Sequence, residues 1–421
     1  MAIEDRIDPA EYFAEQDRRA RRRRRTTRAP REAEQLAETG AGRLLIGLVG
    51  GIALFTVVGL IVLWPGAVHH RGPSQAFGGP TRTANVQRTV EARCSGPTVQ
   101  TCRRLIVGID GRSVAITLGP VRTTPKVVAG DTIRISQTKL QSGVKAPPGF
   151  EPYQFVDLDR QGSIVLIGLV LAALALVLLR WRGLLAAAGV ALSVLLLTTF
   201  VVPALLDGKP ALLVALVGSL AVMFVTLVLT NGVGAQTLAA ALGITTTLLL
   251  VGVLATIFVP LAHLDGHGTD VASVLTLQNG SISLQGVVLA GMVIGGLGVL
   301  ADTGVTQASA VMALRRANPS LGARGLYRGA IVVGRDHLSA TIHTLVLAYA
   351  GASLPLLLAV RSTGLGFSDA LSSQNIAEPV IATMLGCIGL VAALPLTTGL
   401  ASALAARLPA AVVPAGHGHS H

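Results

Sequence analysis

Two apolar stretches of the sequence carry acids, amides, hydroxyls and imidazoles that could bind a solute or move a proton. In the first stretch Asp302, Thr306 and Ser309 recur at helical spacing, so all three share one face, and Gln307 lies beside them. A charged group within an apolar helix costs free energy unless it meets a cation, a proton or a hydrogen-bonding partner. The pattern therefore predicts a polar centre at bilayer depth.

The second stretch carries Asp336, Ser339 and His343 on one face and His337 on the adjoining face. Asp336 lies near the predicted membrane boundary, where anchoring at the interface is a simpler role. For His343 an interhelical hydrogen bond and a contact with a proton or solute are both open. Asp302 is the strongest candidate for a residue that binds a solute or a proton, and the alternative is a structural role. The candidate substrate-binding or ion-binding residues are Asp302, Thr306, Gln307, Asp336, His337 and His343.

A short polar segment, HLDGHGTD, places His263, Asp265, His267 and Asp270 within eight residues. Imidazole and carboxylate groups at this spacing can bind a divalent metal. The glycines between them favour a flexible polar turn instead, so these four residues are weak metal candidates. The sequence contains no nucleotide-binding loop of the GxxxxGKS or GxxxxGKT type, so energy from ATP would have to come from another chain.

Cys94 and Cys102 lie in a polar segment with seven residues between them. Outside the cytoplasm a disulfide would close this small loop, and the alternative is two free thiols. Cys387 lies in an apolar stretch, where we expect a small core residue.

The composition is that of a membrane protein, because apolar residues make up 51% of the 421 residues and charged residues only 13%. The formal net charge of +12 comes mainly from polar segments before Arg182. Surplus arginine commonly sets orientation in a membrane. The basic run also lacks the interleaved aromatic residues of a nucleic-acid site. We therefore expect the lipid bilayer as a partner and no nucleic acid.

We predict a polytopic α-helical membrane protein of about eight transmembrane helices, with a small extracytoplasmic β-rich domain after the first helix. Leu44 to Trp64 is long enough to span a bilayer core of about 30 Å. Alternation in RRLIVGID, SVAITL and DTIRIS indicates strands of a small barrel or sandwich. The predicted parts are a disordered arginine-rich cytoplasmic tail (1–43), a helix (44–64), the β-rich domain (65–162), a seven-helix membrane domain (163–404) and a histidine-containing cytoplasmic tail (405–421).

The later spans are predicted at 163–179, 184–206, 211–230, 237–261, 286–314, 338–360 and 379–404. Arginines gather in the predicted loop between the sixth and seventh spans, whereas the predicted outer loops hold only Lys209 and Arg361. By the positive-inside rule, both termini are then cytoplasmic. The sixth span exceeds the roughly 20 residues of one crossing. It is therefore either tilted and extended or broken near Asp302.

The stretches GVLADTGVTQASAVMAL, followed by NP, and VGRDHLSATIHTLVLAYAGASLPLLL resemble the YibE/F family of multipass bacterial membrane proteins. The resemblance covers about 163–404 and is strongest over 286–358. It implies an integral membrane protein, often described as a permease, with no settled substrate. Members commonly carry two adjacent acids where this chain has Ala301 and Asp302, which puts a mechanism based on a carboxylate pair in doubt. The matching motif positions are Asp302, Thr306, Gln307, Asn318, Pro319, Gly334, Arg335, Asp336, His337, Thr344, Tyr349 and Ser353.

Three functions are consistent with these patterns. We prefer a permease or secondary transporter that moves an unidentified small solute or ion through a polar site between the sixth and seventh helices. The second is a non-transport envelope protein whose outer β-domain senses a ligand or binds a partner. The third is an intramembrane enzyme using Asp302, Asp336, His337 and His343. We expect the bacterial plasma (inner) membrane as the location and no cofactor, and the sequence leaves the oligomeric state open.

Overall fold

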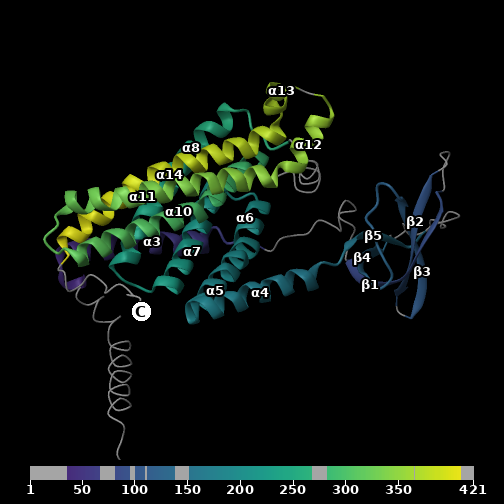
Figure 1. The fold of residues 1–421 in the computed structure, drawn as a ribbon, viewed down its shortest axis with the longest axis horizontal. Helices are drawn as coiled ribbons and strands as arrows, with labels where there is room; N and C mark the ends of the chain where they lie inside the picture. The colour runs from purple at the N-terminus through teal and green to yellow at the C-terminus, as the bar shows by residue number, and fades with distance from the viewer. Residues whose placement is uncertain are drawn as a thin grey trace, which may run out of the picture. The chain divides into compact units, whose positions relative to one another are not determined.

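The structure of the protein is a computed structural model that describes residues 36–66, 81–94, 100–109, 111–137, 151–267, 282–364 and 366–408. The predicted tails before residue 36 and after residue 408, and the metal candidate Asp270, lie outside this part of the chain. The chain divides into two compact units, which we call the helical unit (Met1–Val68 with Leu184–His421) and the β unit (His69–Gly183). Figure 1 draws the elements of both units.

The helical unit consists of long apolar helices and a few short ones, and one further long helix ends the β unit. In chain order they are α3 (Gly40–Val62), α4 (Gln161–Leu179) in the β unit, α5 (Trp181–Leu196), the π-helical turn η2 (Leu197–Val201), α6 (Val202–Leu206), α7 (Ala211–Asn231), α8 (Ala235–Leu261), α10 (Leu284–Ala317), α11 (Ala323–Ala352), α12 (Leu354–Ser362), α13 (Phe367–Ser372) and α14 (Gln374–Arg407). Seven helices of the described residues are long and apolar enough to cross a bilayer, or eight if the bent pair α11 and α12 is one span. The predicted helical fold is thereby confirmed.

Large apolar side chains cover the outside of this bundle. On α3, Leu54 is 64% exposed and Ile61 is 70% exposed. A protein surrounded by water rarely exposes apolar surface on this scale. The exposed faces of α3, α5 and α8 therefore suit contact with lipid.

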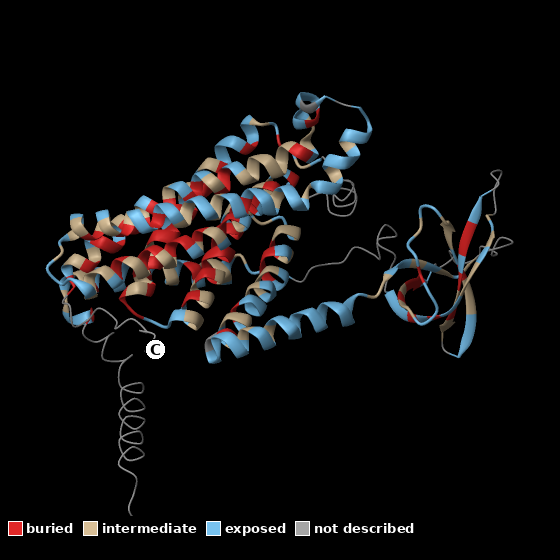
Figure 2. Ribbon diagram, viewed as in Figure 1, coloured by how far each residue is buried: buried red, intermediate tan, exposed pale blue. Residues whose placement is uncertain are grey.

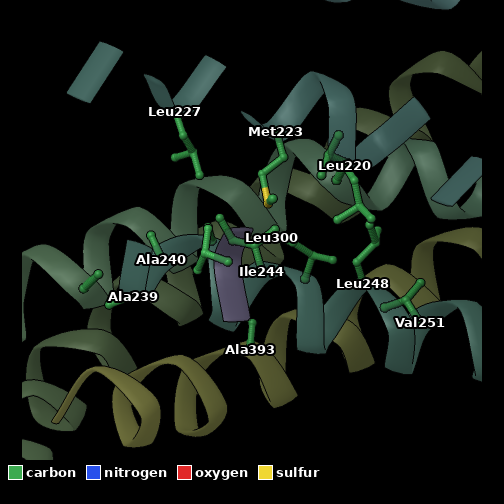
Figure 3. Packing of buried hydrophobic residues seen from close by; sticks show 14 of the residues in the cluster. Leu220, Met223, Leu227, Ala239, Ala240, Ile244, Leu248, Val251, Leu300 and Ala393 are labelled. Carbon is green, nitrogen blue, oxygen red and sulfur yellow. The ribbon is translucent and has the colours of Figure 1, made fainter. Parts of the chain in front are cut away.

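The core of the helical unit lies between α7, α8, α10 and α14, and Figure 2 shows its buried residues along the facing sides of these helices. Ile244 and Leu248 of α8 and Leu300 of α10 are fully buried there (Figure 3). A Cβ at Gly243 of α8 would overlap the side chain of Thr397 of α14. A small residue at this position thus lets the two helices approach closely.

The sixth predicted span is one unbroken helix, so the predicted alternative of a break near Asp302 is wrong. Ser283 caps α10 by accepting a hydrogen bond from the backbone N–H of Gly286 at 3.1 Å. Gly304 follows Asp302 closely without interrupting the helix, because it packs against Ile244 of α8 and has no room for a side chain. The glycine therefore serves packing, and α10 extends beyond the length of one crossing.

The break occurs in the seventh predicted span instead. Pro355 is the second residue of α12, and α11 and α12 are bent by 54°. Proline has no N–H to continue the hydrogen-bond ladder, which accounts for the bend. At its other end α11 begins at Ala323, far before the predicted start of the span, so Arg324 and Arg335 lie on a helix rather than in a loop.

The β unit contains one antiparallel five-stranded sheet that curls into a half-barrel. Its strands are β1 (Thr81–Arg93), β2 (Thr101–Ile109), β3 (Arg112–Pro120), β4 (Thr132–Gln137) and β5 (Tyr153–Leu158), in the order β3-β2-β1-β4-β5. Val86, Leu105, Ile116 and Ile133 alternate inward and form its core. The β-rich domain after the first helix is thereby confirmed, and the three predicted strand stretches coincide with β2, β3 and β4.

Cys94 and Cys102 are joined by a disulfide across the end of the β1–β2 hairpin, with the two Sγ atoms 2.02 Å apart. Glu151 ties the segment before β5 to β3, because its carboxylate accepts hydrogen bonds from the Thr117 backbone N–H and hydroxyl, both at 2.7 Å. Cys387 of α14 is a free thiol of intermediate burial.

Candidate functional site

Asp302 of α10 and His337 of α11 meet across the two helices. The Asp302 Oδ2 and His337 Nε2 atoms are 3.1 Å apart. Since an ionised carboxylate can only accept, the imidazole N–H donates to it. The His337 side chain is 34% exposed and the Asp302 side chain 59% exposed. Both residues lie near the middle of their helices. Two predicted site residues thus form a pair that can hold a cation or exchange a proton.

Gln307 lies five residues further along α10, fully buried where α10, α11 and α14 meet. Thr398 Oγ1 of α14 is 2.9 Å from Gln307 Oε1 and 2.6 Å from the carbonyl oxygen of Leu394. On the other side of the amide, a Cβ at Gly334 of α11 would overlap both Gln307 Nε2 and the Leu394 side chain. Only glycine lets α11 pack this closely against α10 and α14.

The hydrogen bonds around Gln307 favour the opposite orientation of its amide. Thr398 has a single hydroxyl hydrogen, and its contact with the Leu394 carbonyl is the shorter of the two. With Oε1 facing Thr398, Gln307 Nε2 has no hydrogen-bond partner among the described residues. With the amide reversed, the nitrogen donates to a lone pair of Thr398 Oγ1, and the Thr398 hydroxyl keeps its single hydrogen for the Leu394 carbonyl. We therefore assign Gln307 as the donor to Thr398.

The remaining predicted residues do not join the Asp302–His337 pair. His343 Nδ1 donates to the carbonyl oxygen of Ser339 in its own helix at 2.7 Å. His343 and Asp336 are exposed, whereas Thr306 is half-buried. Within the described residues, no hydrogen bond or ion pair links these three side chains to the pair, so they do not form with it the convergent cluster that an enzyme needs.

Three buried hydroxyls lie on α10 and α14, and the sequence patterns did not single out the two on α14. Thr303 of α10 and Thr397 and Ser402 of α14 are each at most 1% exposed. None of their oxygen atoms has a hydrogen-bond partner in the described part of the chain. One sequence signal could have predicted a polar face on α14. Ser402 follows Thr398 by four residues in an apolar span, which puts both on one helix face.

The polar segment that follows α8 forms a turn. His267 donates its backbone N–H to Asp265 Oδ1 at 2.9 Å, and its Nδ1 lies 3.4 Å from Asp265 Oδ2. The backbone hydrogen bond from His267 lowers the pKa of Asp265 below its usual value. His263 has a positive φ of 51°. Among the residues that the structure describes, no three His, Cys, Asp or Glu side chains gather closely enough to hold a metal ion.

A cavity of about 400 Å³ lies at the end of the bundle where α7 and α10 begin and α8 ends. Its polar lining comes from Lys209, Thr256, Ser283 and Gln285, and the rest of the lining is largely apolar. None of the predicted site residues lines it.

A model of the YibE/F-like protein family matches residues 167–407, which include Asp302, Gln307, Gly334 and His337. No curated protein and no solved structure matches the chain. Because the matched range covers more than half of the sequence and contains the paired helices α10 and α11, the chain belongs to the YibE/F-like protein family.

Proposed function

We propose that this multipass membrane protein is a permease that moves a small solute or ion past the Asp302–His337 pair. The observation that carries the proposal is the 3.1 Å contact between these side chains, in the middle of two helices that belong to membrane-length spans. Ionisable groups in such positions commonly mark solute, ion or proton pathways.

Polar groups continue from this pair into the core. Gln307 lies five residues, or about 7 Å along the helix axis, from Asp302. Beyond it, Thr398 and Ser402 add buried hydroxyls from α14. These groups are 0–1% exposed and none of them lines the cavity, so a solute would reach the amide and then the hydroxyls only after the helices had moved apart.

We further propose that the protein lies in the bacterial plasma membrane with both termini in the cytoplasm. Arg315 and Arg324 flank the α10–α11 turn, and Arg180 precedes α5 at a turn on the same predicted side. The turns on the other predicted side carry Lys209 and Arg361. The excess of arginine supports the cytoplasmic assignment. Reporter fusions at the C-terminus and within the β unit would test it.

Charge movement in proteoliposomes on a solid-supported membrane tests the transport proposal without a known solute. Jumps in proton, sodium, potassium, magnesium, phosphate or carboxylate concentration should produce a current for at least one of these probes. We expect Asp302→Asn and His337→Gln to abolish that current. Asp369→Asn, which changes an exposed acid of α13, should leave it intact.

An envelope protein that only senses a ligand or binds a partner would behave differently. Asp302→Asn and His337→Gln would then leave the cellular phenotype unchanged, whereas deletion of the β unit would abolish it. That combination of results would contradict the permease proposal.

A further inference from the structure

The outward side of α11 carries polar groups that the described helices leave uncovered. Asp336, Ser339 and His343 recur along this side and all three are exposed. The exposed Asp302 of α10 borders it, through its contact with His337. In Figure 2, α11 is coloured as exposed or intermediate over most of its length.

The contacts of α10 give the depth of this surface. Ser309 of α10 is hydrogen-bonded to Gln236, the second residue of α8. Asp302 lies seven residues further into the bundle, or about 10 Å from that end. Asp336 is adjacent to His337, so it lies at the same depth as Asp302. The polar surface therefore lies alongside α8, a helix long enough to cross a bilayer, about 10 Å inside the end at which α8 begins.

An uncovered acid at this depth would face lipid, which is unfavourable by several kcal/mol. The cavity of about 400 Å³ offers no alternative cover, because it lies at the other end of the bundle and none of these residues lines it. The outward side of α11 thus requires a polar partner.

We propose that this partner is a second copy of the chain, packed with its own α11 against the same surface. Two copies inserted in the same orientation are related by a two-fold axis along the membrane normal, so residues of equal depth meet. Arg335 and Asp336 are adjacent, exposed and opposite in charge. Arg335 of one copy then meets Asp336 of the other, and the reverse pair forms as well. Ser339 and Ala340 are small enough to let the helices approach.

A different protein would need a matching charge pattern of its own, whereas a second copy supplies it by symmetry. The proposal concerns assembly alone, and it holds whether or not the protein transports a solute.

Disulfide cross-linking in native membranes tests the interface. In a full-length Cys387→Ala background, Ser339→Cys and Thr246→Cys would each be oxidised with a membrane-permeant catalyst. Thr246 is a matched control, because it is exposed on α8, near Ile244, which packs against Gly304 at the depth of the site. We expect a dimer band for Ser339→Cys at least about tenfold stronger than for Thr246→Cys. Equal bands for the two variants would overturn the proposal.

Charge exchange tests the pairing within the same Ser339→Cys background. Arg335→Asp and Asp336→Arg should each reduce the dimer band about tenfold, because each places like charges together. The double variant Arg335→Asp/Asp336→Arg restores opposite pairs and should recover the band. If the double variant cross-links no better than either single variant, the symmetric pairing is wrong. Size-exclusion profiles that match the parent protein would show that each variant is folded.

Discussion

Gly334 of α11 lies against the side-chain amide of Gln307 of α10, leaving no room for even a methyl group. This contact holds the two helices together one turn away from the Asp302–His337 pair. The packing of Gly334 against Gln307 thus helps to position Asp302 next to His337.

Gly334→Ala should destabilise the protein by about 1–3 kcal/mol, because the added methyl group would overlap Gln307 and Leu394. Thermal unfolding in detergent would measure the loss as a lower Tm. Gly351→Ala is the control in the same helix, since a Cβ there has nothing within 4 Å. A Tm for Gly334→Ala equal to that of Gly351→Ala would contradict the close packing.

Gln307→Leu should change stability by less than about 1.5 kcal/mol, because the Thr398 hydroxyl keeps its hydrogen bond to the Leu394 carbonyl and leucine fills a similar volume. Transport should nevertheless fall, since the amide belongs to the proposed route. Tm and proteoliposome current, measured on the same preparation, would separate the two effects. Unchanged current in a stable variant would remove Gln307 from the pathway.

The Asp302–His337 pair should contribute little to stability, about 0.2–1 kcal/mol, because both side chains are partly exposed. A double-mutant cycle with Asp302→Asn and His337→Gln would measure the coupling free energy by thermal or chemical unfolding. A coupling above about 3 kcal/mol would mean that the pair is held in a buried environment and serves the fold.

Reduction of the Cys94–Cys102 disulfide should destabilise the β unit by about 2.5 kcal/mol, the chain-entropy value for such a short loop. Limited proteolysis with and without a reductant would show faster cleavage within 81–158, and cleavage of the helical unit should not change. Cys94→Ser/Cys102→Ser would serve as the permanently reduced form. Equal cleavage of oxidised and reduced protein would contradict this prediction.

The helices and strands could be predicted from the sequence because each has a strong periodic signal. Long apolar runs gave the spans to within a few residues for α7 and α14, and alternation gave β2 to β4. The start of α11 was missed because its first turns carry arginines, and a basic polar stretch between two apolar runs is typical of a loop. The bend at Pro355 was missed because the apolar run continues through it.

The candidate site was only partly predictable. Asp302 and His337 were visible as ionisable groups in apolar segments. Which imidazole reaches the acid depends on the rotation and register of α11 against α10, and helical periodicity within one helix does not determine either. Gly334 fixes both by admitting the Gln307 amide. A glycine in an apolar span can have many roles, so the contact between Gly334 and Gln307 could not be predicted from the sequence.

In the proposed transport mechanism, Asp302 borders a water-accessible route within the membrane. The reaction of Asp302→Cys, in the Cys387→Ala background, with a charged, water-soluble methanethiosulfonate in native membranes would test this directly. Thr246→Cys, exposed on α8 at the same depth, is the reference. We expect position 302 to be modified and position 246 to remain unmodified. If position 302 were as unreactive as position 246, it would be sealed from water and the proposed route would not exist.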